Sequence, residues 1–249
     1  EEFMKETEHI PRITSRRCRR APAIDGELDD AWDVATRIHL NTPRNVGTIP
    51  GPGQLRDWEG EEDLSAVLYT GWDDEYFYFA LDVTDDVLYP YDKDSDTWKG
   101  DCLLIGLDPT GDGGYRQHGN DQLMTLALTV PKRNKLEKNK KDGEDAEEEE
   151  EDEGKKPDGL FSVKKKDDNS GAIYEVGIPW QTFSSEFDGK VGPPLGTDFG
   201  LSLLLTDDDT GQGATKTLSL NPCHLLPRSQ KNWVWRFIIP YFFPRVTLE

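Results

Sequence analysis

Seven tryptophans are spread along the chain, and several of them lie in or beside polar loops. Trp98 precedes an apolar segment within a polar stretch, Trp233 and Trp235 follow the polar residues 228–232, and Trp58 also has polar neighbours. A polar loop offers an indole little apolar surface, so we expect exposed rings. An exposed indole stacks on the C–H face of a sugar while the hydroxyls take polar partners. These tryptophans therefore predict a carbohydrate-binding surface; the alternative is a lid packed on the end of the fold.

Aspartates gather in turns between apolar segments, and the run Asp207-Asp208-Asp209 is the densest of these turns. Calcium prefers several carboxylate and carbonyl oxygens. We therefore expect a structural calcium ion with Asp207 and Asp209 among its ligands, although the turn is not an EF-hand loop. Glu175 lies among apolar and aromatic neighbours and is the best candidate for a catalytic carboxylate. Its alternative is a structural or salt-bridged position on a strand.

The usual motifs of nucleotide-binding proteins, zinc proteases and serine hydrolases are absent from the chain. The four histidines are scattered, and none has a histidine or cysteine at metal-ligand spacing. Three cysteines form neither a disulfide framework nor a CxxC metal site. We therefore expect a noncatalytic protein.

The charge balance of the 249 residues is strongly acidic, with 29 Lys and Arg against 49 Asp and Glu, a net charge of −20. This balance argues against nucleic acid and against anionic lipid as partners, because both require clustered basic residues. No apolar run approaches the roughly 20 residues needed to span a bilayer. The first residues contain no apolar signal core, so any export signal is expected to be already gone.

Short β-rich apolar segments, separated by Gly, Asp and Pro turns, dominate the rest of the chain. They comprise residues 64–69, 76–83, 101–107, 122–130, 172–178, 199–206 and 216–220. Helix is expected only as single turns at 29–35 and 180–183. This spacing predicts an all-β, antiparallel β-sandwich of jelly-roll type, and Trp32, Trp72 and Trp180 are expected in its core.

Two segments are expected to lie outside the core. Residues 1–21 form an N-terminal tail, or a first strand, that contains the basic cluster 16–20. Residues 132–168 are a charged insertion that cannot bury enough apolar surface to fold, so we expect a long disordered loop. Its 14 acidic residues are nearly balanced by 11 basic ones, so most of the negative charge belongs to the predicted single domain, 22–249.

Several motifs follow one another in an order typical of one family. Residues 23–32, AIDGELDDAW, fit the opening IDGxLDDxxW, and residues 98–109 partly fit WxxDxVExxxDP. Residues 174–180, YEVGIPW, match a late strand and its turn, and residues 240–248 match a closing strand. In this order the motifs resemble the family 9 carbohydrate-binding modules. The resemblance implies a noncatalytic β-sandwich, often with structural calcium, attached to secreted enzymes that act on glycans.

The same resemblance implies a sugar slot between two tryptophans. Trp98 matches the first, and the second falls among Trp233, Trp235 and Phe237. Polar partners for the sugar hydroxyls are implied at Gln122 on the following strand and at Asp85 in an earlier loop. Departures from the family pattern occur where its polar residues are replaced by the apolar residues Leu104, Met124 and Leu126.

The expected partner is therefore an oligo- or polysaccharide, together with other domains of a larger extracellular or periplasmic protein. One alternative is a scaffold or protein-interaction domain with a degenerate sugar site, as Leu104 and Met124 would allow. A second alternative is a haem-binding domain with Met124 and either His118 or His224 as axial ligands. A third alternative is a hydrolase that uses Glu175.

Overall fold

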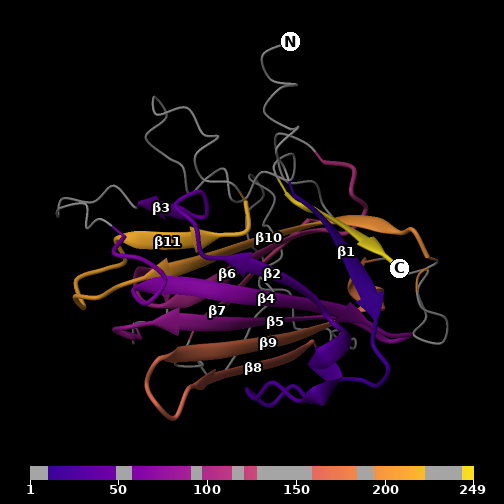
Figure 1. Cartoon of the computed structure of the whole chain (residues 1–249). Helices are drawn as coiled ribbons and strands as arrows, with labels where there is room; N and C mark the ends of the chain where they lie inside the picture. Colours follow the sequence, from indigo (N-terminus) through magenta and orange to yellow (C-terminus); the bar gives the residue numbers. More distant parts are fainter. Residues whose placement is uncertain are drawn as a thin grey trace, which may run out of the picture.

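The computed structural model describes residues 11–48, 58–90, 97–113, 121–127, 159–183, 193, 195–221 and 243–249. These residues form twelve strands in two facing layers, joined by β1 (Arg12–Arg17) (Figure 1). The first layer contains β3 (Val46–Thr48), β11 (Lys216–Ser219), β10 (Asp198–Asp207), β12 (Arg245–Leu248), β6 (Cys102–Asp108) and β7 (Gln122–Ala127). The second contains β2 (Thr36–Leu40), β4 (Leu64–Trp72), β5 (Tyr76–Asp85), β9 (Gly171–Pro179) and β8 (Leu160–Lys165). The predicted β-sandwich is thus confirmed.

The core lies between the two layers, because alternate residues of facing strands point inward. Leu103, Ile105 and Leu107 of β6 meet the inward residues of β4, β5 and β9, and all three are completely buried. Trp72 and Trp180 lie in this core, whereas Trp32 packs with Tyr78 and Ala80 in a second, smaller cluster. All three are at most 2% exposed, which confirms that they are buried as predicted. Burial of such large apolar side chains contributes strongly to the stability of the fold.

Helix is scarce in the described residues. It is limited to η2 (Asp30–Val34), η3 (Thr97–Lys99) and α2 (Trp180–Phe183). The Asp29 carboxylate caps η2 by accepting a hydrogen bond from the Ala31 amide at 2.8 Å. Within these residues, no helix is long and apolar enough to cross a bilayer.

The N-terminal segment contains a first strand, which was the alternative to a tail. Residues 12–17 form β1, which is parallel to both of its partners: Arg12–Ser15 pair with β12, and Arg16–Arg17 pair with β4. Ile13 and Ser15 face inward and are at most 2% exposed. The first strand is therefore part of the fold, and it passes from one layer to the other.

The predicted insertion at 132–168 is too long at its C-terminal end. Residues 160–165 form β8, which pairs with β9 along its whole length, and residues 166–170 form the turn between them. Phe161 and Val163 pack against the core from the edge of the second layer. Residues 131–158 lie outside the described residues.

Candidate functional site

Trp98 lies on η3, immediately before β6, at the end of the sandwich where β5 and β10 also terminate. It is 41% exposed, whereas the three core tryptophans are almost completely buried. The Lys99 ammonium lies 5.6 Å from the centroid of the Trp98 ring. The ammonium thus lies over one face of the exposed indole, in a cation–π position, where it is also a hydrogen-bond donor within reach of a bound sugar hydroxyl.

A second exposed aromatic, Tyr89, lies in the same region and was not predicted. Its side chain is 45% exposed. Its backbone is fixed to the segment that follows Trp98, because the Asp101 amide donates to the Tyr89 carbonyl at 3.2 Å and the Tyr89 amide donates to the Asp101 carboxylate. The ring lies against Gly211, where a Cβ would come within 2.3 Å of it. The only signal in the sequence was an aromatic residue in a turn after a strand.

Gln122, a predicted sugar-binding residue, does not lie beside Trp98. Gln122 pairs with Leu107 at the far end of β6, on the order of 15 Å along the strand from Trp98. Its side chain has the inward direction of Met124 and Leu126, and its Nε2 donates to the Thr182 carbonyl at 3.3 Å. Trp233 and Trp235 lie outside the described residues.

Asp85 also differs from its predicted role. It is only 1% exposed, and its side chain belongs to a cluster of buried carboxylates. The correction has a simple physical origin: Asp85 is the last residue of β5, and its side chain faces the interior there. A sugar hydroxyl has no access to a carboxylate buried to this extent.

The buried cluster consists of Asp85, Asp101 and Asp207, whose carboxylate oxygens all lie within 4.8 Å of one another. Each comes from the end of a different strand: Asp85 ends β5, Asp207 ends β10, and Asp101 directly precedes β6. All three are at most 2% exposed. Neighbouring strand ends therefore bring together carboxylates that lie far apart in the sequence.

Hydrogen bonds satisfy only part of this cluster. One oxygen of Asp85 accepts from the Val87 amide at 2.9 Å, and Asp101 accepts from the Asp208 and Tyr89 amides. Within the described residues, Asp85 Oδ2 and Asp207 Oδ1 are buried with no hydrogen-bond donor. Buried anionic oxygens without donors are costly unless a cation or proton compensates them.

The crowding of these carboxylates favours their protonated forms. Burial, followed by the charge of Asp101, raises the pKa of Asp85 to about 8. Burial likewise raises the pKa of Asp101 to about 6, although two backbone amides oppose the shift. Burial and the charge of Asp85 also raise the pKa of Asp207. These carboxylates therefore favour protons, and a divalent cation would displace those protons.

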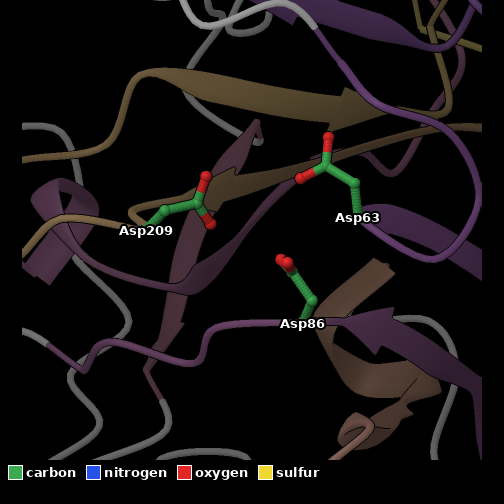
Figure 2. Close-up of side chains that lie close together, drawn as sticks. All are labelled: Asp63, Asp86 and Asp209. Atoms are coloured by element: carbon green, nitrogen blue, oxygen red, sulfur yellow. The ribbon is translucent and has the colours of Figure 1, made fainter.

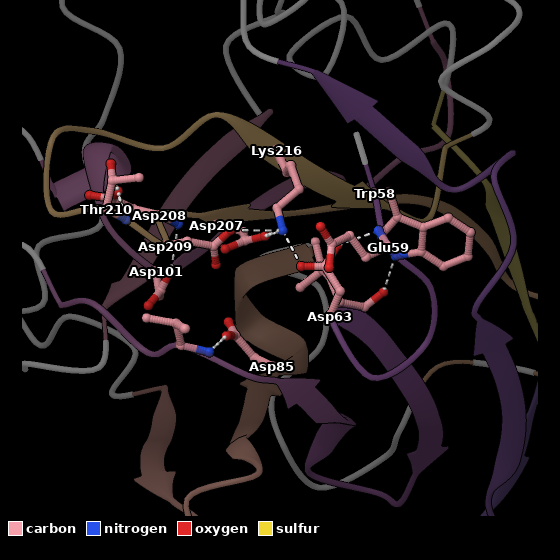
Figure 3. A network of polar contacts seen from close by, with 12 residues as sticks. Trp58, Glu59, Asp63, Asp85, Asp101, Asp207, Asp208, Asp209, Thr210 and Lys216 are labelled. Carbon is pink, nitrogen blue, oxygen red and sulfur yellow. Dashed lines mark hydrogen bonds and ion pairs between the residues drawn. The ribbon is translucent and has the colours of Figure 1, made fainter. Parts of the chain in front are cut away.

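A second group of carboxylates, Asp63, Asp86 and Asp209, lies next to the first and points toward a common space (Figure 2). The Lys216 ammonium enters this region from β11 and contacts Asp207 at 3.0 Å, Asp209 at 2.9 Å and also Asp63 (Figure 3). Lys216 is only 1% exposed. The protein thus supplies one buried cation of its own to these carboxylates.

Asp208, which lies between the two predicted calcium ligands in the sequence, has a different role. Its carboxylate accepts from the amides of Thr210, Gly211 and Gly213 at 2.9–3.0 Å. Gly211 and Gly213 have φ angles of 69° and 120°, which favour glycine. Asp208 therefore folds the turn that follows β10, and its oxygens are used by backbone amides.

The donor set fits a calcium ion. Asp85, Asp101 and Asp207 offer only oxygen ligands, as hard divalent cations prefer. Lys216 compensates only part of the negative charge of the two adjoining groups of carboxylates. The unsatisfied oxygens of Asp85 and Asp207 are the feature that a bound cation would resolve. Asp207 and Asp209 thus fall in adjoining groups, with Asp207 in the more deeply buried one.

Glu175 and Met124 both have structural roles in the fold. Buried Glu175 accepts hydrogen bonds from the Asp25 amide at 3.0 Å, the Gly26 amide at 2.6 Å and the Trp32 indole at 3.0 Å. It therefore connects the opening motif, residues 23–32, to β9. This is the structural position on a strand that was the alternative to a catalytic role. Met124 packs in the core at 6% exposure. His118 and His224, its proposed partners for haem, lie outside the described residues.

Comparison with known proteins decides the family. A family model described as "Carbohydrate family 9 binding domain-like" matches residues 24–223, well over half of the chain. The chain belongs to this family. The predicted resemblance is thereby confirmed, and the chain is a carbohydrate-binding module of this family.

Solved structures show the same fold. A family 9 carbohydrate-binding module from Caldicellulosiruptor kristjanssonii, in complex with cellotriose, matches with a TM-score of 0.63 at 19% identity, covering 96% of this chain and 93% of that one. Its complex with glucose gives a TM-score of 0.62 at 19% identity, with 95% of each chain covered. Exoglucanase XynX of Acetivibrio thermocellus is 34% identical over 80 residues, 30% of this chain. The match spans only 6% of that enzyme's length.

Proposed function

We propose that this module binds glucose-containing oligo- or polysaccharides by stacking a sugar ring on Trp98. The observation that carries the proposal is the exposure of this indole, 41%, at the end of the sandwich. Lys99 beside the ring supplies a donor for a hydroxyl, and Tyr89 supplies a second exposed aromatic fixed to the same segment. The solved relatives were bound to cellotriose and glucose, which makes these sugars the first ligands to test.

Calorimetric titration of cellotriose into the wild type and Trp98→Ala tests this proposal. Loss of a stacked aromatic should weaken binding by about 1–3 kcal/mol, which is roughly 5- to 150-fold in affinity. Trp98→Tyr retains a ring and should bind more tightly than Trp98→Ala. Val87→Ala removes another exposed apolar side chain and serves as the matched control. Equal affinities of wild type and Trp98→Ala would instead favour the scaffold or protein-interaction domain.

The module also binds a structural calcium ion, in our proposal, through Asp85, Asp101 and Asp207, with Asp209 in the adjoining group. The unsatisfied buried oxygens and the excess of negative charge support it. Calcium should raise the midpoint of thermal unfolding of the wild type, and much less that of Asp207→Asn. An identical response of both proteins would rule out this site.

The proposed setting is an extracellular or periplasmic protein with further domains. Support comes from Exoglucanase XynX, of which the matched part is a small fraction. Detection of the full-length natural protein in the culture medium or periplasmic fraction would support this location, and its confinement to the cytoplasmic fraction would contradict it. The exclusion of nucleic acid stays a prediction from the charge.

A further inference from the structure

The turn after β10, residues 208–214, contacts both segments that carry exposed aromatic residues. The amide of its last residue donates to the Lys99 carbonyl at 2.5 Å, directly beside Trp98 in the chain. At Gly211 the same turn lies against the side chain of Tyr89. In the part of the chain that the structure describes, Trp98 and Tyr89 are the only exposed aromatic side chains. One turn therefore supports both of them.

The position of the Tyr89 ring depends on the absence of a side chain at Gly211. A Cβ at Gly211 would overlap the Cζ, Oη and Cε1 atoms at the tip of this ring. The turn itself is held at that point, because the Asp208 carboxylate accepts from the Thr210 and Gly211 amides at 2.9 Å. A methyl group at Gly211 would therefore displace the free end of the ring, since a side chain moves more easily than a turn bound by several hydrogen bonds.

An aromatic ring that is held in place and still exposed is suited to bind a ligand. The Tyr89 side chain is 45% exposed although its tip lies against the turn. A ring that is already positioned loses little conformational freedom when a ligand covers it, and such a loss opposes binding. Tyrosine also offers a ring face to the C–H groups of a sugar and a hydroxyl to its polar groups. Tyr89 therefore has the properties of a second sugar-contacting residue.

We propose that Tyr89 binds a neighbouring unit of the sugar chain that stacks on Trp98, and that Gly211 positions the Tyr89 ring for this contact. This second subsite rests on the proposed function at Trp98. Its segment is joined to the one that carries Trp98 by the hydrogen bond from the Asp101 amide to the Tyr89 carbonyl at 3.2 Å. Two aromatic contacts favour an oligosaccharide over a monosaccharide, so Tyr89 sets the preference for chain length.

Calorimetric titrations with glucose and with cellotriose test this subsite, because the ratio of the two affinities reports on contacts beyond the first sugar unit. Tyr89→Ala should weaken the binding of cellotriose by about fivefold or more, and that of glucose by less than about twofold. Tyr89→Phe keeps the ring and should bind cellotriose more tightly than Tyr89→Ala. Circular dichroism of each variant checks that the fold is unchanged.

Gly211→Ala tests the positioning role. It should weaken the binding of cellotriose, and the double variant with Tyr89→Ala should lose no more affinity than Tyr89→Ala alone. Gly196→Ala is the matched control: Gly196 has a φ of 81°, close to the 69° of Gly211, but a Cβ there meets no atom within 4 Å. Gly196 also precedes β10, at the other end of that strand. Both alanines should lower thermal stability through backbone strain, so a loss of cellotriose affinity confined to Gly211→Ala reports on the ring.

The second subsite and the proposed function can fail separately. If Trp98→Ala weakens glucose binding while Tyr89→Ala leaves the ratio of cellotriose to glucose affinity unchanged, the subsite is wrong and the proposed function stands. If Trp98→Ala leaves the affinity for both sugars unchanged, the proposed function is wrong and the subsite with it. Equal effects of Gly211→Ala and Gly196→Ala on cellotriose binding would overturn the positioning role of Gly211.

Discussion

At the scale of single residues, the most unusual feature is the concentration of buried carboxylates at one end of the sandwich. Few hydrogen-bond donors reach the carboxylates of Asp85, Asp101 and Asp207. Among the described residues, Lys216 supplies the only buried ammonium group beside them. Protons and cations are therefore alternative ways of compensating the same charge. With calcium bound as proposed, this competition would make the stability of the module dependent on both pH and calcium.

The pH dependence of the calcium-free protein follows from the raised pKa values of about 8 for Asp85 and about 6 for Asp101. Between pH 4 and 8 the folded chain retains protons that the unfolded chain has lost, so the free energy of unfolding falls as pH rises. In EDTA, the midpoint of thermal unfolding should therefore decrease from pH 5 to pH 8. Saturating calcium should reduce this decrease, and Asp85→Asn should flatten it. A midpoint in EDTA that rises over this range would contradict the burial of these carboxylates.

Lys216 offers a second prediction at the residue scale. Lys216→Met keeps an unbranched apolar stem but leaves three buried carboxylates without their ammonium. Urea unfolding at pH 7 should show a loss of about 3–5 kcal/mol. Lys164→Met, which removes an exposed partner of Glu27, should change stability little. Equal stability of the two variants would mean that Lys216 does not compensate the cluster.

Single residues were predictable from the sequence where a residue's own neighbours determine its environment. Trp98 in its polar loop and Trp180 in its apolar segment are placed as expected. Asp85 was assigned to the wrong partner, because the position of that residue depends on strand ends more than a hundred residues apart in the chain. Gln122 was misplaced for a related reason: its inward direction is set by the register of β7 with β6.

At the scale of elements, Glu175 connects two segments that the family motifs treat separately. It lies on β9, and its three donors come from the stretch that leads into and forms η2. Gly26 has a φ of 87°, and a Cβ there would come within 2.4 Å of Lys164 on β8. The opening motif thus packs over the β8–β9 edge, with the carboxylate of Glu175 as its anchor.

Replacement of Glu175 tests this connection. Glu175→Gln turns one acceptor into an NH₂ group that faces other donors, so it should destabilise the module by about 1–3 kcal/mol in urea unfolding. Trp32→Phe removes one of the three hydrogen bonds and should cost less than this if the ring packing is retained. Glu27→Gln, on the exposed surface nearby, serves as the control. A stable Glu175→Gln variant would show that the opening motif is held by packing alone.

Strands in which apolar residues form a clear pattern were predicted from the sequence, whereas strands that contain many charged residues were not. Residues 172–178 and 199–206 were identified within one residue of the observed strands β9 and β10. β8 was assigned to the charged insertion because lysines follow its two core-facing residues, Phe161 and Val163. Likewise, the arginines of β1 left a tail and a first strand both open, although Ile13 and Ser15 alternate toward the interior.

At the scale of the whole molecule, the order of the motifs predicted the sandwich, whereas the pairing of the terminal strands could only be seen in three dimensions. β12 lies between β1 and β10, and Val246 and Leu248 are at most 1% exposed in the core. The last strand is therefore needed to complete the first layer and to hold β1.

Removal of residues 245–249 tests the importance of this closing strand. The truncated chain would expose the edges of β1 and β10 and lose two buried core residues, so we expect it to lose cooperative unfolding. Circular dichroism during heating, compared with Thr247→Ala as a mild change in the same strand, would measure this. A sharp transition in the truncated chain would contradict the expectation.

The parallel pairing of β1 and β12 has a mechanical consequence. Arg12 pairs with Arg245 and Ser15 with Leu248, so the N-terminal end of β1 and the C-terminal end of β12 lie at opposite ends of one hydrogen-bonded ladder. A force that pulls the two strands apart through these ends acts along the ladder and loads its bonds together, in shear, instead of opening them one by one. A module pulled through both of these ends would therefore resist extension at β1 and β12, where the load enters.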